Sequence, residues 1–107
     1  MENDSGYAVI ITTCADREQA EKLASALVSS RLAACVQLSD TTSFYTWKGS
    51  VEKENEVRLM IKARKVLYPE IETFIIENHP YELPEVIMLP IADGLAGYLD
   101  WIDASSR

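Results

Sequence analysis

The sequence of 107 residues lacks several features that mark common classes of protein. It has no apolar run of about 18 residues, so we expect no segment to span a membrane. It has no Lys/Arg cluster and carries a net charge of −7, which argues against nucleic acids and anionic membrane surfaces as partners. There are only four glycines, and they form no phosphate-binding loop.

Cysteine and histidine are also scarce. The two cysteines, Cys14 and Cys35, lack CxxC spacing, which excludes a zinc knuckle or a thioredoxin-like motif. The first six residues are polar and acidic, without the basic and then apolar layout of a secretory signal. We therefore expect a reduced, cytoplasmic protein.

The sequence shows no arrangement of reactive side chains that is typical of a catalytic site. No nucleophile–base pair is visible, and the serines have no partner histidine other than His79, the only one in the sequence. The acidic residues are spread mostly over helix exteriors, where they indicate a solvated surface rather than a catalytic dyad. We expect a protein that is not an enzyme and has no organic cofactor.

The first half of the chain shows clear periodic patterns. Branched apolar residues over 7–13 predict a strand. Asp16 is placed to cap a helix after it, with Gln19 suited to the reciprocal contact of a capping box. The apolar face of this helix is predicted to contain Ala20, Leu23, Ala24, Leu27 and Val28.

Alternating side chains over 33–63 predict a long hairpin that turns at Lys48-Gly49. A second helix around 67–78, a strand over 86–91 and a short helix over 95–102 complete the chain. One layer of helices cannot cover the distal part of the hairpin, so we expect that part to project.

This order of elements predicts an α+β fold, the ferredoxin-like βαββαβ sandwich with a long central hairpin and a short C-terminal helix. A small parallel α/β fold is the alternative, and the direct hairpin at Gly49 argues against it. We expect residues 1–6 to form a disordered tail and residues 7–107 to form a single domain.

The segment 79–85 is the most constrained part of the chain. Two prolines restrict its backbone, and Glu82 and Glu85 follow His79 closely. Imidazole suits copper and zinc, and the two carboxylates could add oxygen ligands. The alternative is that His79 caps the second helix, with its ring against backbone carbonyls.

The predicted topology brings distant residues together. The first strand ends where the second helix ends and the last strand begins, which places Cys14, His79 and Glu85 at one end of the sheet. Cys35 opens the second strand at the opposite end, several residues of ~3.3 Å away. A disulfide requires Cα atoms within ~7 Å, so we predict no intrachain disulfide.

Five motifs follow one another along the chain. They are Arg31-Leu32-Ala33-Ala34-Cys35-Val36, Tyr45-x-Trp47-Lys48-Gly49, Glu56 with Ile61-Lys62, His79-Pro80-Tyr81-Glu82-x-Pro84-Glu85, and Tyr98-Leu99-x-Trp101-Ile102. Together they resemble the CutA1 family, the divalent-cation tolerance proteins. The resemblance runs from Tyr7 to the end of the chain.

The resemblance implies a CutA1-like subunit in a tight homotrimer, in which the long hairpins of neighbouring subunits pair. It also implies a response to metal ions, with copper or another divalent cation as a low-affinity ligand. The candidate metal ligands are His79, Glu82, Glu85 and Cys14. One histidine cannot complete such a site alone, but a trimer could supply ligands from two chains.

The chain departs from the pattern of the copper-binding relatives. Those have a cysteine near the end of the first strand and a doubled histidine before the proline, where this sequence has Thr12 and Asn78-His79. Cys14 is on the same strand face as Thr12 but ~7 Å further along. Tight copper(I) binding, which favours thiolate or thioether ligands, is therefore not expected.

The aromatic residues of the motifs have two interpretations. They could pack the core and the subunit interface, as such residues commonly do. They could instead line a ligand cleft between subunits, as in the PII signalling trimers that the architecture resembles. A third possibility is a stable scaffold without a ligand. The candidate cleft residues are Tyr45, Trp47, Glu56, Lys62, Tyr81 and Trp101.

Overall fold

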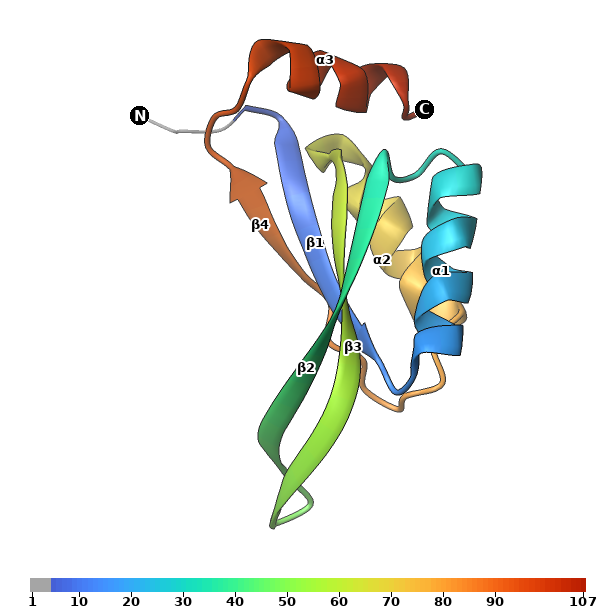
Figure 1. Cartoon of the computed structure of the whole chain (residues 1–107), viewed down its shortest axis with the longest axis vertical. Helices are drawn as coiled ribbons and strands as arrows, with labels where there is room; N and C mark the ends of the chain where they lie inside the picture. Colours follow the sequence, from blue (N-terminus) through green and yellow to red (C-terminus); the bar gives the residue numbers. More distant parts are fainter. Residues whose placement is uncertain (1–4) are drawn as a thin grey trace.

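A four-stranded antiparallel sheet in the order β2-β3-β1-β4 forms the frame of the molecule (Figure 1). The computed structural model describes residues 5–107. Its elements are β1 (Tyr7–Cys14), α1 (Arg17–Ser29), β2 (Cys35–Trp47), β3 (Ser50–Arg64), the 3₁₀ turn η1 (Lys65–Leu67), α2 (Tyr68–Glu77), β4 (Ile87–Ile91) and α3 (Ala96–Ala104).

The ferredoxin-like prediction is confirmed, and the parallel α/β alternative is wrong. Every pair of neighbouring strands is antiparallel, and β1 and β2 run in the same direction on either side of β3. The helices α1 and α2 pack side by side on one face of the sheet (Figure 1). The predicted tail falls mostly outside the described residues, although Ser5 donates a backbone hydrogen bond to the Ile91 carbonyl.

Alternate side chains of β1 and β3 build the core beneath the two helices. The fully buried members include Ile10 and Ile61 of the sheet, Leu27 of α1, and Ile71 and Ile75 of α2. Each apolar side chain of this kind contributes about 1.5–3 kcal/mol on burial. One predicted member of the α1 face is wrong, because Val28 is 42% exposed at the last turn of the helix.

Thr12 is a polar exception in this core. Its side chain is completely buried, and its hydroxyl oxygen has no hydrogen-bond partner. We expect Thr12→Val to raise the free energy of unfolding by about 1 kcal/mol, because valine has nearly the same shape and removes an unsatisfied group. Urea denaturation measures the change, with Thr73→Val on the exposed surface of α2 as the control. Equal or lower stability of Thr12→Val would contradict this account.

The β2–β3 hairpin turns in two residues and projects beyond the sheet. Lys48 and Gly49 both have positive φ, 50° and 85°, as the tight primed turns of hairpins require. The β1 pairing of β3 ends at Val57, whereas β2 continues to pair with it as far as Ser50. The distal arm of the hairpin therefore has no third strand beside it, as the sequence predicts (Figure 1).

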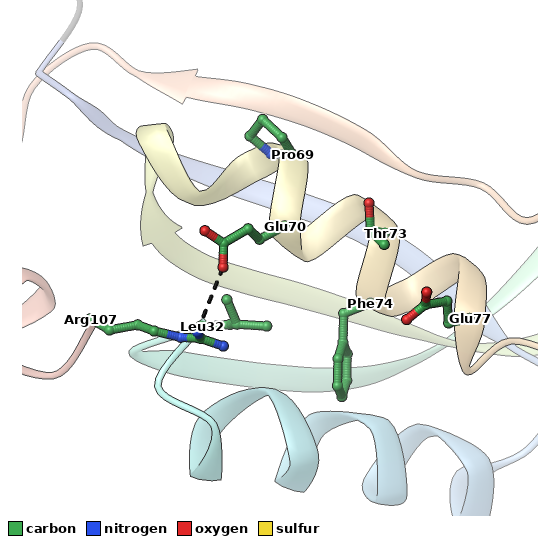
Figure 2. Close-up of a pocket in the computed structure, with 7 residues that line it drawn as sticks. All are labelled: Leu32, Pro69, Glu70, Thr73, Phe74, Glu77 and Arg107. Atoms are coloured by element: carbon green, nitrogen blue, oxygen red, sulfur yellow. Dashed lines mark ion pairs between the residues drawn. The ribbon is translucent and has the colours of Figure 1, made fainter.

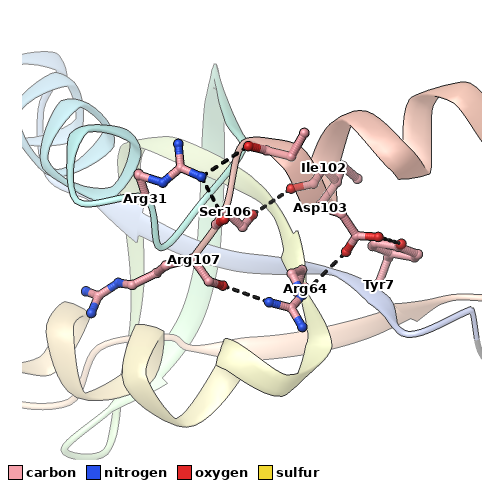
Figure 3. A network of polar contacts seen from close by, with 8 residues as sticks. Tyr7, Arg31, Arg64, Ile102, Asp103, Ser106 and Arg107 are labelled. Carbon is pink, nitrogen blue, oxygen red and sulfur yellow. Dashed lines mark hydrogen bonds and ion pairs between the residues drawn. The ribbon is translucent and has the colours of Figure 1, made fainter.

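The helix α3 lies across the end of the sheet opposite the hairpin tip (Figure 1). Asp103 of α3 accepts a hydrogen bond from the Tyr7 hydroxyl and forms an ion pair with Arg64 at 3.4 Å. The Arg64 guanidinium also donates to the Arg107 carbonyl at 2.8 Å. These contacts fasten α3 to the first and third strands (Figure 3).

Arg31, in the connection from α1 to β2, holds the residues after α3. Its guanidinium donates to the carbonyls of Ala104 and Ser106 at 3.1 and 2.9 Å (Figure 3). Its own carbonyl accepts from the Arg107 amide at 3.0 Å. Arg31 has a φ of 63°, a left-handed conformation that is uncommon for a residue with a side chain. No local pattern in the sequence predicts these contacts of Arg31.

Candidate functional site

The segment from His79 to Glu85 joins α2 to β4, at the end of the sheet from which the hairpin leaves. Nε2 of His79 lies 2.6 Å from the Thr13 carbonyl oxygen of β1. A carbonyl oxygen only accepts, so Nε2 carries the proton and donates. The Tyr81 amide donates to Nδ1 at 3.2 Å. Both ring nitrogens of a neutral imidazole are therefore engaged in holding the backbone.

The alternative prediction for His79 is that its ring caps the carbonyls of α2. This prediction names the wrong partner. The ring bonds to β1 instead, and the neighbouring Asn78 caps α2 by donating from its side chain to the Phe74 carbonyl at 2.8 Å. The amide reaches back along its own helix, which leaves the imidazole free to cross to the sheet. His79 thus joins α2 to the central strand.

Tyr81 extends this connection to β3. Its hydroxyl donates to Oε2 of Glu56 at 3.0 Å, and its ring lies 4.6 Å from the His79 ring, centroid to centroid. Burial first, and then the hydrogen bond to Glu56 and the charge of that carboxylate, raise the pKa of Tyr81. The phenol therefore remains a donor at every physiological pH. Thr13, Glu56, His79 and Tyr81 form one network, which we call the histidine-loop network.

Cys14 lies beside this network with its side chain only 2% exposed. Burial raises the pKa of its thiol to about 11, and the negative charges of Asp16 and Glu56 act in the same direction. The thiolate is the form that binds metals and reacts with electrophiles. At neutral pH the side chain is therefore a protonated thiol that favours neither role.

We expect iodoacetamide to modify Cys35 faster than Cys14 in the folded protein, because Cys35 is more exposed and Cys14 holds its proton more tightly. The rate at Cys14 should rise with pH until the thiol ionises near 11, since the raised pKa lowers the thiolate fraction below that point. Peptide mass mapping measures both sites, with the urea-unfolded chain as a control that should react alike at both. Faster modification of Cys14 at pH 7 would contradict this assignment.

The four candidate metal ligands do not form a metal-binding group within one chain. Among residues 5–107, no three His, Cys, Asp or Glu side chains are arranged to hold a metal ion. Glu82 and Glu85 are exposed, whereas His79 already bonds through both nitrogens. Both cysteines are free thiols, at the opposite ends of the sheet that the sequence predicts.

The six candidate cleft residues lie in three places. Glu56 and Tyr81 bond to each other, and Trp47 lies at the hairpin tip with the Lys48 ammonium 5.8 Å from its ring centroid. Tyr45 is on the hairpin arm, where burial and then the charges of nearby glutamates raise its pKa. A single chain does not gather these side chains into one pocket.

The third place is at α3. The Lys62 ammonium lies 5.5 Å from the ring centroid of Tyr98, and Trp101 stacks on that ring at 5.5 Å. Tyr98, one of the motif aromatics to which the sequence gives both interpretations, completes this aromatic pair. It lies three residues before Trp101 on a short helix, a spacing that places the two rings on one face.

The chain matches the family model described as CutA1 divalent ion tolerance protein over residues 8–105. The protein CutA of Homo sapiens is 41% identical to it, over 94% of this chain and 60% of the human one. The crystal structure of CutA1 from Shewanella sp. SIB1 is 41% identical, with a TM-score of 0.92 over 96% of this chain and 97% of that one. The periplasmic divalent cation tolerance protein CutA from Archaeoglobus fulgidus is 33% identical, with a TM-score of 0.91 over 92% and 97% of the two chains.

These likenesses define a class of small α+β proteins named for tolerance of divalent cations. The chain belongs to the CutA1 family, as its motifs indicate. It spans about 60% of the length of its human relative. Within residues 5–107, no helix is both long enough and apolar enough to cross a membrane.

Proposed function

We propose that this chain acts in the cytoplasm as a homotrimeric divalent-cation tolerance protein, without catalytic activity, that binds copper or another divalent metal ion. Membership of the family named for divalent ion tolerance supports the general role. The observation that supports the proposed trimer is the projecting hairpin. The two free cysteines of the chain support the proposed cytoplasmic location, because they fit a reducing compartment. The Archaeoglobus fulgidus relative, in contrast, is described as periplasmic.

The hairpin presents apolar side chains and an unpaired strand edge together. Phe44 is 68% exposed and Val51 is 78% exposed, and β2 is an edge strand along its whole length. An exposed edge of this length with apolar side chains is a template for pairing with another chain. In a closed trimer each β2 edge would be covered by a neighbouring subunit.

Light scattering at micromolar concentration tests the assembly. We expect a particle of three subunits for the natural sequence, and a large shift toward monomer for Phe44→Glu combined with Val51→Lys. Val66→Lys is the matched control, because Val66 is 69% exposed but lies in η1, away from the hairpin. A natural chain that is monomeric at this concentration would overturn the proposed trimer.

In the proposed metal site, donors come from two subunits: His79 with Glu82 and Glu85 from one chain, and a further donor, with Cys14 as a candidate, from the assembly. Exposed carboxylates suit weak binding of hard cations, and His79 would have to release one of its two hydrogen bonds to coordinate a metal. This cost is consistent with low affinity.

Calorimetry of the metal-free protein with copper, zinc and magnesium tests the site. We expect weak binding of copper or zinc that His79→Ala reduces and that Glu82→Gln with Glu85→Gln also reduces. Glu21→Gln, on the exposed face of α1, is the control. If His79→Ala binds copper with unchanged affinity, the histidine-centred site is wrong even if the trimer is correct.

A second candidate function is a PII-like sensor with a small-molecule cleft between subunits. The Lys62 ammonium beside the Tyr98–Trp101 pair favours it, since Trp101 is 44% exposed on the surface. A basic group next to an open aromatic ring suits a planar anion. A rise in melting temperature with nucleotides, lost in Lys62→Met, would support the sensor, and no rise with any nucleotide would argue against it.

A further inference from the structure

Two hollows lie beside α2, the first between this helix and residues Leu32 and Arg107, the second between this helix and α1. The first has a volume of about 420 Å³ and is lined by residues that include Leu32, Pro69 and Thr73 (Figure 2). The second has a volume of about 440 Å³ and lies toward the histidine loop. Phe74 and Glu77 belong to the walls of both. Sites for small molecules commonly have volumes of about 300–1,000 Å³, so both could hold a ligand.

The charges of the first hollow are largely satisfied within the protein. Glu70 forms an ion pair with Arg107 at 3.7 Å across its mouth (Figure 2). Both groups are well exposed, so the pair is weak but needs no further partner. The remaining polar groups of its lining are Thr73 and Glu77, and within residues 5–107 no second cation lines it.

The second hollow contains an unsatisfied acceptor. Gln19 lies in the first turn of α1, where its amide donates to Asp16 at 2.8 Å and so forms half of the predicted capping box. The prediction of the reciprocal contact, from the Gln19 side chain back to the cap residue, is wrong. Oε1 of Gln19 is buried and has no hydrogen-bond partner. Gln19 lines the hollow, but Oε1 itself is shut off from solvent, so the side chain must turn toward the hollow before a ligand can reach it. A buried acceptor without a donor is costly, and a hydrogen bond from a ligand would remove that cost.

Opposite charges from opposite helices line the same hollow. Lys22 comes from α1 and Glu77 from α2, and among the described residues neither forms an ion pair within 4.0 Å. The Cys14 thiol at the inner end carries its proton and adds no charge. The hollow thus presents one cation and one carboxylate that are not paired with each other.

The walls between these polar groups are apolar. Leu23 and Ala26 of α1 face Phe74 of α2, whose ring points toward α1 (Figure 2). Pro80 of the histidine loop closes one side. The lining therefore combines an apolar body with a donor group and two acceptor groups at its edges.

We propose that this hollow binds a free α-amino acid with an aliphatic side chain. The ligand ammonium would donate to Glu77 and, once the Gln19 side chain turns toward the hollow, to its Oε1. The ligand carboxylate would accept from Lys22, and the ligand side chain would lie against Leu23 and Phe74. A monovalent anion or cation would pair only one of the two charges, whereas a zwitterion pairs both. The site lies within one subunit and does not depend on the cleft between subunits, but His79 and Cys14, two candidate ligands of the proposed metal site, also line the hollow.

Titration of the full chain with L-leucine, followed by NMR, tests the proposal. We expect saturable shifts in the resonances of Leu23, Ala26 and Phe74. Leucinamide lacks the carboxylate and 4-methylpentanoate lacks the ammonium, so each should bind about tenfold more weakly, as expected for loss of a charge-assisted hydrogen bond. Equal affinity for all three probes, or no saturable shift with leucine, would overturn the proposal.

Two variants test which residue binds the carboxylate of the ligand and which binds its ammonium. Lys22→Met should weaken leucine binding about tenfold but leave leucinamide binding unchanged, since leucinamide has no carboxylate to lose. Glu77→Gln should weaken leucine binding and leave 4-methylpentanoate binding unchanged. Glu21→Gln, an exposed neighbour on α1 outside the hollow, is the control and should bind leucine normally. If the two variants affect all three probes equally, the zwitterion assignment is wrong.

Discussion

His79→Ala is expected to lower the free energy of unfolding by about 2 kcal/mol. The substitution removes the bond from Nε2 to the Thr13 carbonyl and the bond from the Tyr81 amide to Nδ1, and it leaves both backbone groups without their partner. It also removes the ring that packs against Tyr81. Urea denaturation of both proteins at the same concentration and in the presence of a chelator measures the loss, so that neither dilution nor bound metal contributes to the difference.

Two conservative variants separate the two bonds. The side-chain amide of glutamine can reach as Nε2 does, so His79→Gln should retain the bond to Thr13 and lose the bond from Tyr81. Asparagine places an acceptor near the Nδ1 position, so His79→Asn should retain the bond from Tyr81 alone. We expect each to be about 1 kcal/mol less stable than the natural chain, intermediate between it and alanine. If all three variants are as stable as the natural chain, the network does not support the fold.

Arg31→Ala is expected to have a similar effect at the other end of the molecule, with a loss of about 2 kcal/mol in the free energy of unfolding. The guanidinium donates to the carbonyls of Ala104 and Ser106, and hydrogen bonds from charged donors are worth more than neutral ones. Their partial exposure reduces this value from the full range. Thermal and urea unfolding measure the change.

Comparing Arg31→Gly with Arg31→Ala separates the backbone strain at residue 31 from the loss of the side-chain hydrogen bonds. Glycine loses the same side-chain bonds but adopts the φ of 63° without the cost that a Cβ brings. We therefore expect Arg31→Gly to be about 1 kcal/mol more stable than Arg31→Ala. Arg17→Ala, which breaks an exposed ion pair with Asp40, is the control for loss of a surface arginine and should change stability by less than about 1 kcal/mol. Equal stability of the alanine and glycine variants would show that the backbone at residue 31 is not strained.

Local chemistry predicted the parts of this fold that depend on neighbours in the sequence. The turn at Lys48-Gly49 was found because few residues adopt two consecutive positive φ angles. The helix cap at Asp16 was predictable because its carboxylate accepts from the backbone amide of Gln19, only three residues along the chain. Val28 was misplaced because helical periodicity alone does not show how much of a helix face its neighbours cover in the fold.

The connections of the candidate site depend on distant partners that no local pattern encodes. The ring of His79 bonds to a main-chain carbonyl 66 residues earlier, and any residue type at position 13 would provide that carbonyl. The side chain of Gln19 fits a capping box by spacing, but in the fold it lies at the hollow between two helices. The family motifs directed attention to the histidine loop, whereas the partner of each side chain required the three-dimensional structure.

The hairpin arm has a consequence for how the chain exchanges its amide hydrogens. Beyond Val57 the arm is a two-stranded ribbon, and such ribbons are only marginally stable alone in water. In an isolated subunit its amides should therefore exchange almost as fast as those of an open chain, while those of β1 exchange only when the whole domain unfolds. If subunits cover the arm, its exchange should slow as protein concentration rises. The ratio of the two exchange rates would then report the fraction of assembled chains without any measurement of mass.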